Sequence, residues 1–285
     1  TDRAADPRAH AYLIDGAHHP VRIDNAVEAA WGDDVVLSSP TTDPTASQPW
    51  YAAGFTVVDL FTPQEFATQR DDVEATVGGI LDDHGRDTTG FTLERYHHHV
   101  DDEAHAAVVG RTRDLFQHDL TLEVATMHDR LGEVLGIRLT DRVAVTDAPM
   151  TLHVIVRLIR PRSTDFNPVH KDIYEAVDHF GLTPPLVNFW IPVAGCGPDS
   201  SLPVAPGSHL IPESQILRTR AGSVVHGRHY RVNSTLEWAG SRDLQRAEVA
   251  DGQALVFSSH LVHGLAVNTQ PDTTRVALEF RLVPA

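Results

Sequence analysis

A mainly β fold with flanking helices is predicted for this chain of 285 residues. From residue 142 onward, β-branched runs are separated by Pro, Gly and Asp, which is typical of short antiparallel strands joined by turns. Between residues 62 and 135, three segments have apolar residues at helical spacing. These observations predict a closed or sandwiched antiparallel sheet with helices packed against it. The expected strands after residue 142 cover 152–159, 186–193, 245–249, 254–257 and 275–283.

The chain is expected to divide into an N-terminal arm, 1–50, packed on the core, and one domain, 51–285. The arm is polar and rich in Asp, His and Pro, and 38–44 has the composition of a loop. A short strand is expected at 54–60. The length of the chain suits a single β-rich domain with helical additions.

Three helices are expected in the first half of the chain. Thr62, Pro63 and Glu65 combine a capping box with proline at the first helical position, which predicts a helix from there to about Asp83. Helical spacing also covers 102–118 and 121–135. Gly136 is placed to end the last of these helices.

The formal net charge of −16 argues against nucleic acid or an anionic membrane surface as a partner. It also favours a cationic substrate by long-range attraction, although solubility alone explains an acidic chain. Cys196 is the single cysteine, so there is no disulfide framework and we expect a cytoplasmic protein. No apolar stretch approaches the length of a membrane span, and the start has no signal-peptide core.

A metal site is predicted from two separated segments. His170 and Asp172 follow the run 152–159 and a polar loop, and a strand would present these alternate residues on one face. A second histidine, His263, lies far downstream before a glycine. Two imidazoles and one carboxylate on one face of Fe(II) leave positions open for a co-substrate and oxygen, which is the layout of an oxygenase.

The His-x-Asp pair by itself is weak evidence in a chain with 18 histidines and 39 acidic residues. A second pair, His99 and Asp101, is interpreted as a solvated helix start with an aspartate cap. The run 97–99 is expected to be a loop, because three consecutive histidines cannot face one ion on a regular element. His209 is expected to support a turn, and His260 to lie on the face opposite His263.

Arg275 is the predicted anchor for a dicarboxylate. The segment 264–274 looks like a strand end, a turn at 270–272 and a returning strand, and such a hairpin would place Arg275 beside the strand of His263. A planar guanidinium there can hold a carboxylate through two hydrogen bonds. The alternative, an ordinary charge on a strand, fits Arg275 taken alone.

From Tyr51 onward the chain resembles the phytanoyl-CoA dioxygenase-like family of Fe(II)/2-oxoglutarate oxygenases. The family's metal motif matches His170 and Asp172, its distal histidine matches His263, and its 2-oxoglutarate arginine matches Arg275. A hydrophobic strand at 186–193 and a Pro-Gly-Ser-His turn at 206–209 match as well. The segment 195–201 departs from the family pattern because it lacks the usual Asn-Gly.

The resemblance implies a double-stranded β-helix, a cupin-like jelly roll whose mouth holds the metal. It implies Fe(II), 2-oxoglutarate and O2 as cofactor and co-substrates, and it places Trp190 in the 2-oxoglutarate pocket. Asn188, two residues earlier on the strand, would share the face of Trp190. Related halogenases have a small residue in place of Asp172, so its carboxylate indicates hydroxylation, desaturation or oxidative ring closure.

The resemblance is closest to members that tailor antibiotics, including those that form orthoesters in compounds of the hygromycin and everninomicin type. It implies a small sugar-containing or aminoglycoside-type substrate, whose ammonium groups would meet acidic side chains. Candidate substrate residues are Lys171, Tyr174 and Glu175 after the metal motif, and Arg228 and Tyr230 in the insertion between 211 and 238. Each has an alternative as a polar surface residue.

The rival prediction from another class is a non-redox jelly roll, either a sugar-binding module or a cupin-like isomerase. Asp172 together with Arg275 disfavours it. A binding module needs neither an open iron coordination sphere nor a dicarboxylate anchor.

Overall fold

A computed structural model describes residues 6–116, 119–120, 124–144 and 149–285 and shows mostly strands with few helices, as predicted. The α-helices are α1 (Pro63–Asp83), α2 (Asp102–Thr112), α3 (Val124–Leu135) and α4 (Ile173–Phe180). Short 3-10 helices cover Ala26–Glu28, Pro44–Ser47, Leu93–His98, Ser208–Leu210 and Glu213–Gln215. Among the described residues, no helix combines the length and apolar character needed to cross a membrane.

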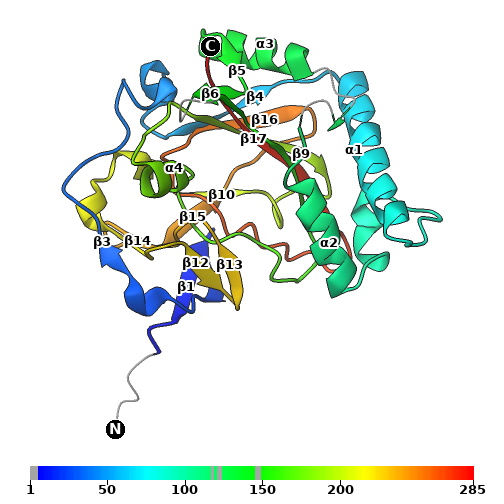
Figure 1. Ribbon diagram of the computed structural model, residues 1–285, viewed down its shortest axis with the longest axis horizontal. Helices are drawn as coiled ribbons and strands as arrows, with labels where there is room; N and C mark the ends of the chain where they lie inside the picture. Colours follow the sequence, from blue (N-terminus) through cyan, green and yellow to red (C-terminus); the bar gives the residue numbers. More distant parts are fainter. Residues whose placement is uncertain (1–5, 117–118, 121–123, 145–148) are drawn as a thin grey trace.

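The largest sheet, called the main sheet below, has the strand order β4-β16-β9-β17-β5, and β8 also pairs with β17 (Figure 1). All of its pairings are antiparallel. The long strand β17 is central because it pairs with β9, β8 and β5. The strands of the main sheet are β4 (Phe55–Asp59), β5 (Leu139–Thr140), β8 (Val154–Ile159), β9 (Val187–Ala194), β16 (Gln253–Ser258) and β17 (Arg275–Pro284).

The two faces of the main sheet differ because successive side chains of a strand point to opposite sides. One face carries apolar side chains such as Val156, Phe189 and Leu278, which belong to one buried cluster with residues of α1, α2 and α3. The other face carries Arg157 and Trp190, which line a cavity together with charged residues of β17. The helices therefore supply the core on one side and leave the opposite face for the site.

Among the residues that the structure describes, no strand ladder joins the four smaller sheets to the main sheet. In Figure 1, β1, β3 and β12 to β14 lie below the main sheet, whereas β6 lies near the top, beside β5. The strand orders of the smaller sheets are β10-β15-β1-β2, β14-β11-β3, β12-β13 and β6-β7. Within the described residues, no ladder joins these sheets and the main sheet into a closed barrel. The strands are β1 (Ala9–Ile14), β2 (Ala17–Arg22), β3 (Ala30–Trp31), β6 (Arg142–Ala144), β7 (Pro149–Thr151), β10 (Pro203–Val204), β11 (Ile216–Arg218), β12 (Ser223–Val225), β13 (Arg228–Tyr230), β14 (Thr235–Trp238) and β15 (Asp243–Arg246).

The N-terminal 50 residues contain strands that the sequence interpretation did not anticipate. β1 and β2 form a hairpin around Asp15 and Gly16, whose φ angles of 51° and 80° are both positive, as in a two-residue turn of type I′. β1 also pairs with β15, and β3 pairs with β11. An Asp-Gly pair between short apolar runs is a hairpin signal, and it was present in the sequence.

The structure contains the three predicted helices, but α2 is shorter than predicted, because residues 113–116 are described and are not helical. α1 begins at Pro63, and both hydrogen bonds of the capping box between Thr62 and Glu65 are present. α2 ends at Thr112, earlier than predicted, and residues 117–118 and 121–123 of the two predicted helices lie outside the described residues. The strand predicted at 245–249 is observed as β15, which begins and ends earlier.

Candidate metal and co-substrate site

Two histidines far apart in the sequence meet through their backbones. His170 N–H donates to the carbonyl of His263 at 2.8 Å, and His263 N–H donates to the carbonyl of His170 at 2.9 Å. Gly264 permits this approach, since its φ is +123° and a Cβ there would collide with the carbonyl oxygen of Pro168. The backbone thus fixes the two imidazoles side by side, with ring centroids 4.4 Å apart.

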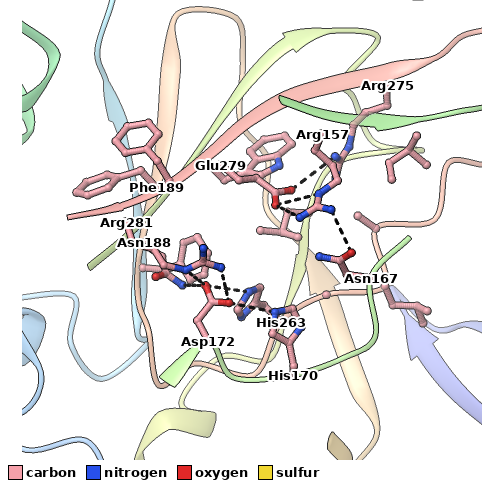
Figure 2. Close-up of a pocket in the computed structure, with 18 residues that line it drawn as sticks. Arg157, Asn167, His170, Asp172, Asn188, Phe189, His263, Arg275, Glu279 and Arg281 are labelled. Carbon is pink, nitrogen blue, oxygen red and sulfur yellow. Dashed lines mark hydrogen bonds and ion pairs between the residues drawn. The ribbon is translucent and has the colours of Figure 1, made fainter. Parts of the chain in front are cut away.

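Each imidazole is oriented by a backbone carbonyl. Nδ1 of His170 lies 2.7 Å from the oxygen of Pro168, and Nδ1 of His263 lies 2.9 Å from the oxygen of Leu261. A carbonyl only accepts hydrogen bonds, so both Nδ1 atoms carry the proton and a neutral ring presents the lone pair of Nε2. Both Nε2 atoms face Asp172, at 3.1 Å for His170 and 3.8 Å for His263 (Figure 2).

These three side chains, called the buried trio below, offer ligand atoms within 4.8 Å of one another. Two imidazole lone pairs that face a carboxylate repel it unless a cation lies between them or a ring is protonated. Burial and the neighbouring His170 lower the pKa of His263 to about 4, so His263 is neutral near pH 7. The arrangement of the buried trio therefore fits a divalent metal ion.

Asp172 lies at the start of a helix and not on a strand, which corrects the sequence prediction. Its φ and ψ of −61° and −33° are helical, and it is the N-cap residue of α4. His170 itself takes part only in an isolated bridge with His263. The two motif residues share one face because the chain turns into α4 after Lys171, not because a strand alternates.

Two side chains that the sequence did not single out as carboxylate partners hold Asp172. Arg281 donates from Nε and Nη2 to its two oxygens at 2.8 and 2.6 Å, and Asn188 donates from Nδ2 at 2.6 Å (Figure 2). Burial disfavours the charged carboxylate, but Arg281 and the two histidines outweigh it and hold the pKa of Asp172 well below its usual value. The carboxylate is therefore ionised and its orientation is fixed from two strands, β9 and β17.

Arg275 lies in the same cavity as the buried trio and is fully buried. Its Nε donates to the carbonyl of Ser200 at 3.1 Å, whereas Nη1 and Nη2 are buried with no hydrogen-bond partner. Its guanidinium lies over the ring of Trp190, 5.4 Å from the centroid. A buried guanidinium with two unused donors is costly unless an anion binds there, so this end of the cavity fits a carboxylate.

The hairpin predicted between His263 and Arg275 is wrong. Arg275 opens β17 and pairs with Ile159 of β8, while His263 forms only isolated bridges with His170 and Val204. The two residues meet because β17 lies in the main sheet and His263 lies in the segment facing it. Both residues line the same cavity, although no hairpin joins them.

Glu279, a charged residue next to Arg275, was not among the predicted site residues. Glu279 accepts from Arg157 at 2.9 and 3.1 Å and lies 3.9 Å from Nη1 of Arg275. Arg157 also donates to Asn167 at 3.2 Å. A signal existed, because Glu279 and Arg281 follow Arg275 at even spacing on one strand and period two predicts a common face.

The five predicted substrate residues fall in three places. Lys171 and Tyr174 are fully buried and both bind Glu213, with 2.8 Å from Lys171 Nζ and 2.8 Å from the Tyr174 hydroxyl. Neither residue lines the cavity of the buried trio or the cavity beside α2, and both side chains are instead bound to the Glu213 carboxylate.

The remaining three substrate residues are more accessible. Glu175 is half exposed and lies 3.9 Å from Arg231 at the surface. Arg228 and Tyr230 line a second cavity, beside α2. None of the five candidates lines the cavity of the buried trio.

A second group of ligand types occurs at the surface. His97, His98 and Asp272, called the exposed trio below, also offer ligand atoms within 4.8 Å of one another. Both Nε2 atoms lie near Oδ1 of Asp272, at 2.9 and 3.1 Å, but Arg95 donates to its other oxygen at 3.1 Å. The run 97–99 was expected to be a loop, but His97 and His98 end a short 3-10 helix, Leu93–His98.

The structure also places the pair of His99 and Asp101, His209 and His260. Asp101 caps α2 by accepting from the N–H of Ala104, as predicted for a helix start. His209 lies in the short helix after Gly207, with its ring 4.9 Å from that of Tyr51. His260 turns away from the buried trio, and its Nε2 lies 3.3 Å from the oxygen of Thr42.

Comparison with known proteins decides the family. The family described as phytanoyl-CoA dioxygenase (PhyH) matches residues 50–277, which is most of the chain. The chain belongs to the phytanoyl-CoA dioxygenase family. A search of curated proteins gives no match.

Three solved structures are similar to this chain at low sequence identity. The apo form of EctD from S. alaskensis is 15% identical over 90% of this chain and 84% of that chain, with a TM-score of 0.46. AviO1 from Streptomyces viridochromogenes is 15% identical over 86% and 96%, with a TM-score of 0.45. SnoK, a non-heme α-ketoglutarate-dependent carbocyclase from nogalamycin biosynthesis, is 17% identical over 89% and 88%, with a TM-score of 0.41.

Membership of the family and the arrangement of the cavity agree. The protein is a dioxygenase that uses Fe(II), 2-oxoglutarate and O2. The predicted enzyme class and cofactors are thereby confirmed, and the non-redox alternative is disfavoured.

Proposed function

We propose that His170, Asp172 and His263 hold Fe(II) and that Arg275 binds the far carboxylate of 2-oxoglutarate. The observation that carries this assignment is the pair of Arg275 nitrogens without hydrogen-bond partners, in the same cavity as two oriented Nε2 atoms and a carboxylate. Trp190 would line the co-substrate pocket under the guanidinium. Asn188 would act on the metal ligand, because its amide donates to Asp172.

When bound, Fe(II) and 2-oxoglutarate supply the oxidising chemistry, in which O2 is consumed and succinate and carbon dioxide are released. The chain's own residues orient and shield these groups. Arg275 would pair with the far carboxylate of the dicarboxylate, while Arg281 and Asn188 hold the Asp172 carboxylate in one orientation beside the two imidazoles. Buried apolar side chains, including Phe257 and Leu202, limit the access of water to the cavity.

The reaction we propose is oxidation of a C–H bond, by hydroxylation or oxidative ring closure. The carboxylate of Asp172 supports this outcome over halogenation, because it fills the position that a halide would need. We propose a small sugar-containing natural product as substrate, such as an antibiotic intermediate of the aminoglycoside type. The sequence resemblance and the net charge of −16 support this class.

We also propose that residues 1–50 form an arm on an oxygenase domain of residues 51–285. The main sheet and the smaller sheets would then correspond to the two halves of a cupin-like jelly roll. The pairing of β1 with β15 supports an arm that is packed on this domain.

An anaerobic spectroscopic titration tests the proposed residues. Fe(II) added with 2-oxoglutarate to the wild type is expected to give a weak visible charge-transfer band. Asp172→Ala and Arg275→Ala are expected to lose or weaken the band, whereas His99→Ala, in the other His-x-Asp pair, is expected to keep it. A folded wild type with no band would favour the non-redox jelly roll, and equal bands in all variants would move the site elsewhere.

The substrate class has a separate test. Sugar-containing natural products, with and without amino groups, are screened for substrate-stimulated succinate release by the wild type. Stimulation by amino sugars alone would support the aminoglycoside proposal. Stimulation only by compounds without sugars would contradict it.

A further inference from the structure

A second cavity lies between α2, β8 and β13, away from the buried trio. Its volume is about 300 Å³, and its lining includes Arg113 at the end of α2, Arg157 of β8, and Arg228 and Tyr230 of β13. It is called the arginine cavity below. Arg157 also lines the cavity of the buried trio, so the two cavities are neighbours across one guanidinium.

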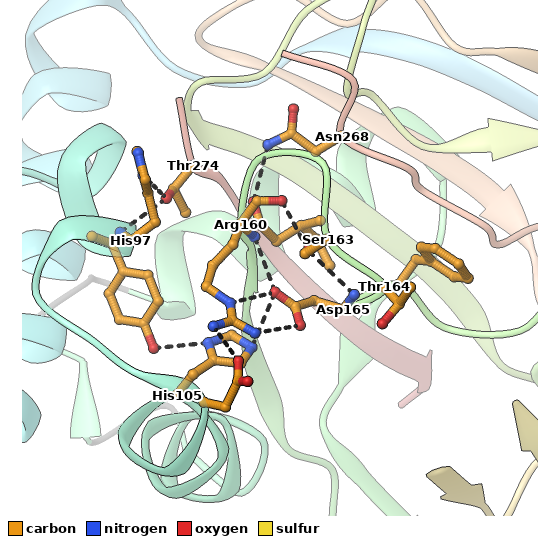
Figure 3. A network of polar contacts seen from close by, with 12 residues as sticks. His97, His105, Arg160, Ser163, Thr164, Asp165, Asn268 and Thr274 are labelled. Carbon is orange, nitrogen blue, oxygen red and sulfur yellow. Dashed lines mark hydrogen bonds and ion pairs between the residues drawn. The ribbon is translucent and has the colours of Figure 1, made fainter. Parts of the chain in front are cut away.

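The carboxylates around the arginine cavity already have partners. Asp165, which is almost completely buried, accepts from Arg160 at 2.8 and 3.1 Å and lies 3.3 Å from Nε2 of His105 (Figure 3). Arg160 also donates to Asp102 at 2.8 Å. These interactions anchor the loop after β8 to α2 and leave little negative charge for other arginines.

Arg157 is likewise committed, because it donates to Glu279 and Asn167. It therefore forms a fixed wall of the arginine cavity, and its charge is paired with Glu279. Arg228 is more loosely held, since its Nη1 lies 3.3 Å from both Asp165 and the carbonyl of Thr164 and its side chain is 47% exposed.

Arg113 has no carboxylate within ion-pair distance among the described residues. Its Nε is buried with no hydrogen-bond partner. Burial and the nearby Arg157 lower the pKa of Arg113, but a guanidinium stays charged. A buried N–H donor without an acceptor is costly, and a bound anion would provide the acceptor.

We propose that the arginine cavity binds an oxyanion, a phosphate or carboxylate group carried by a small molecule, through Arg113 and Arg228. The forked guanidinium of Arg113 suits either anion, and the loosely held Arg228 can turn toward it from the opposite wall. A cavity of about 300 Å³ leaves room for more than the anionic group itself. The site is separate from the proposed 2-oxoglutarate anchor at Arg275.

Calorimetric titration of the metal-free protein with inorganic phosphate, and separately with acetate, tests this site. Arg113→Gln is expected to weaken binding of the preferred anion by at least about tenfold, as for the loss of a charge-assisted hydrogen bond. The matched control is Arg111→Gln on the same helix, because Arg111 is exposed and binds Asp83 at 2.7 Å. It is expected to bind like the wild type.

Two further variants complete the test. Arg228→Gln, an exposed change that spares the helix, is expected to weaken binding severalfold and serves if Arg113→Gln does not fold. Arg275→Ala is expected to leave this affinity within about twofold, since its unpartnered nitrogens lie in the other cavity. The proposal is overturned if neither anion binds the wild type, if Arg275→Ala alone removes binding, or if Arg113→Gln and Arg228→Gln both match Arg111→Gln.

The anion that binds the wild type more tightly, phosphate or acetate, identifies the chemistry of the ligand. Because no metal or 2-oxoglutarate is present, the titration stands apart from the oxygenase assignment. Loss of the charge-transfer band would therefore leave this result unchanged.

Discussion

The buried trio and the exposed trio contain the same ligand types at similar separations, yet their surroundings differ. In the buried trio, backbone carbonyls orient both imidazoles, and Arg281 and Asn188 hold Asp172. In the exposed trio, Asp272 is 56% exposed and shares its charge with Arg95. We therefore expect the buried trio to bind a metal ion more tightly than the exposed trio, because hydrogen bonds around the ligands set their tautomer and orientation.

The largest expected effect comes from removing the carboxylate of the buried trio. Asp172→Ala is expected to reduce metal binding from about one ion per chain to none, and to abolish succinate formation. Equilibrium dialysis with Fe(II) under anaerobic conditions and a succinate assay measure the two effects. Asp272→Ala is the matched control in the exposed trio and should change neither. Loss of the ion from the control would reverse the comparison.

The next largest effect is expected on stability, from the buried ion pair between Lys171 and Glu213. Lys171→Ala removes the cationic partner of the buried Glu213 carboxylate and leaves only the Tyr174 hydroxyl bound to it, and breaking such a buried ion pair typically costs about 3–5 kcal/mol of stability. Arg95→Ala, which breaks the exposed pair with Asp272, should cost no more than about 1 kcal/mol. Urea unfolding of both variants compares them. Equal losses would show that burial does not separate the two regions.

Arg275→Ala is expected to raise the 2-oxoglutarate requirement on the order of 100-fold. Truncating one partner of a buried charge pair costs about 2–5 kcal/mol, and tenfold in affinity corresponds to about 1.4 kcal/mol. Succinate release measured against 2-oxoglutarate concentration gives the shift, while metal binding should persist. An unchanged requirement would place the anchor at another cation, with Arg157 the nearest candidate.

Arg281→Gln should lower metal affinity by about 10- to 100-fold, because groups that orient a ligand typically contribute that much. Competition between Zn(II) and a chromophoric chelator measures it without reference to activity. Arg281→Lys keeps the charge but not the two hydrogen bonds and should recover only part of the affinity. Wild-type affinity in both variants would show that Asp172 needs no partner.

The smallest effect is expected at the exposed trio in acid. The hydrogen bond from His97 and the nearby positive charges lower the pKa of Asp272 below 3.8. A lowered folded pKa means that the stabilisation is complete above about pH 5 and is lost as the pH falls through the lowered value. Asp272→Asn should therefore be slightly less stable than the wild type near pH 6, and the difference should vanish toward pH 2. Thermal unfolding at several pH values measures it, and a difference that grows in acid would contradict the sign.

Local features of the fold were readable from the sequence. The capping box at Thr62 and Glu65 depends on residues three apart, and it placed the start of α1 correctly. The β-branched runs placed β8, β9, β16 and β17 to within a few residues. The hairpin of β1 and β2 was missed, although Asp15 and Gly16 carried the signal.

The geometry around the site was only partly readable. The sequence predicted the buried trio and Arg275, but it placed Asp172 on a strand and joined Arg275 to His263 by a hairpin. In the structure Asp172 starts α4, and Arg275 pairs with β8. Short polar segments such as 160–172 fit several backbone paths, so composition could not choose between a strand and a helix start.

The sequence by itself determined which chemical groups are available, since ligand types, helix caps and strand alternation depend on near neighbours along the chain. Only the tertiary structure decided that Arg281 binds Asp172, 109 positions away, and that Arg275 keeps two nitrogens without hydrogen-bond partners. It also buried one of the two similar trios and left the other at the surface. Contacts between distant residues follow from strand register and packing of the whole sheet, which no local pattern specifies.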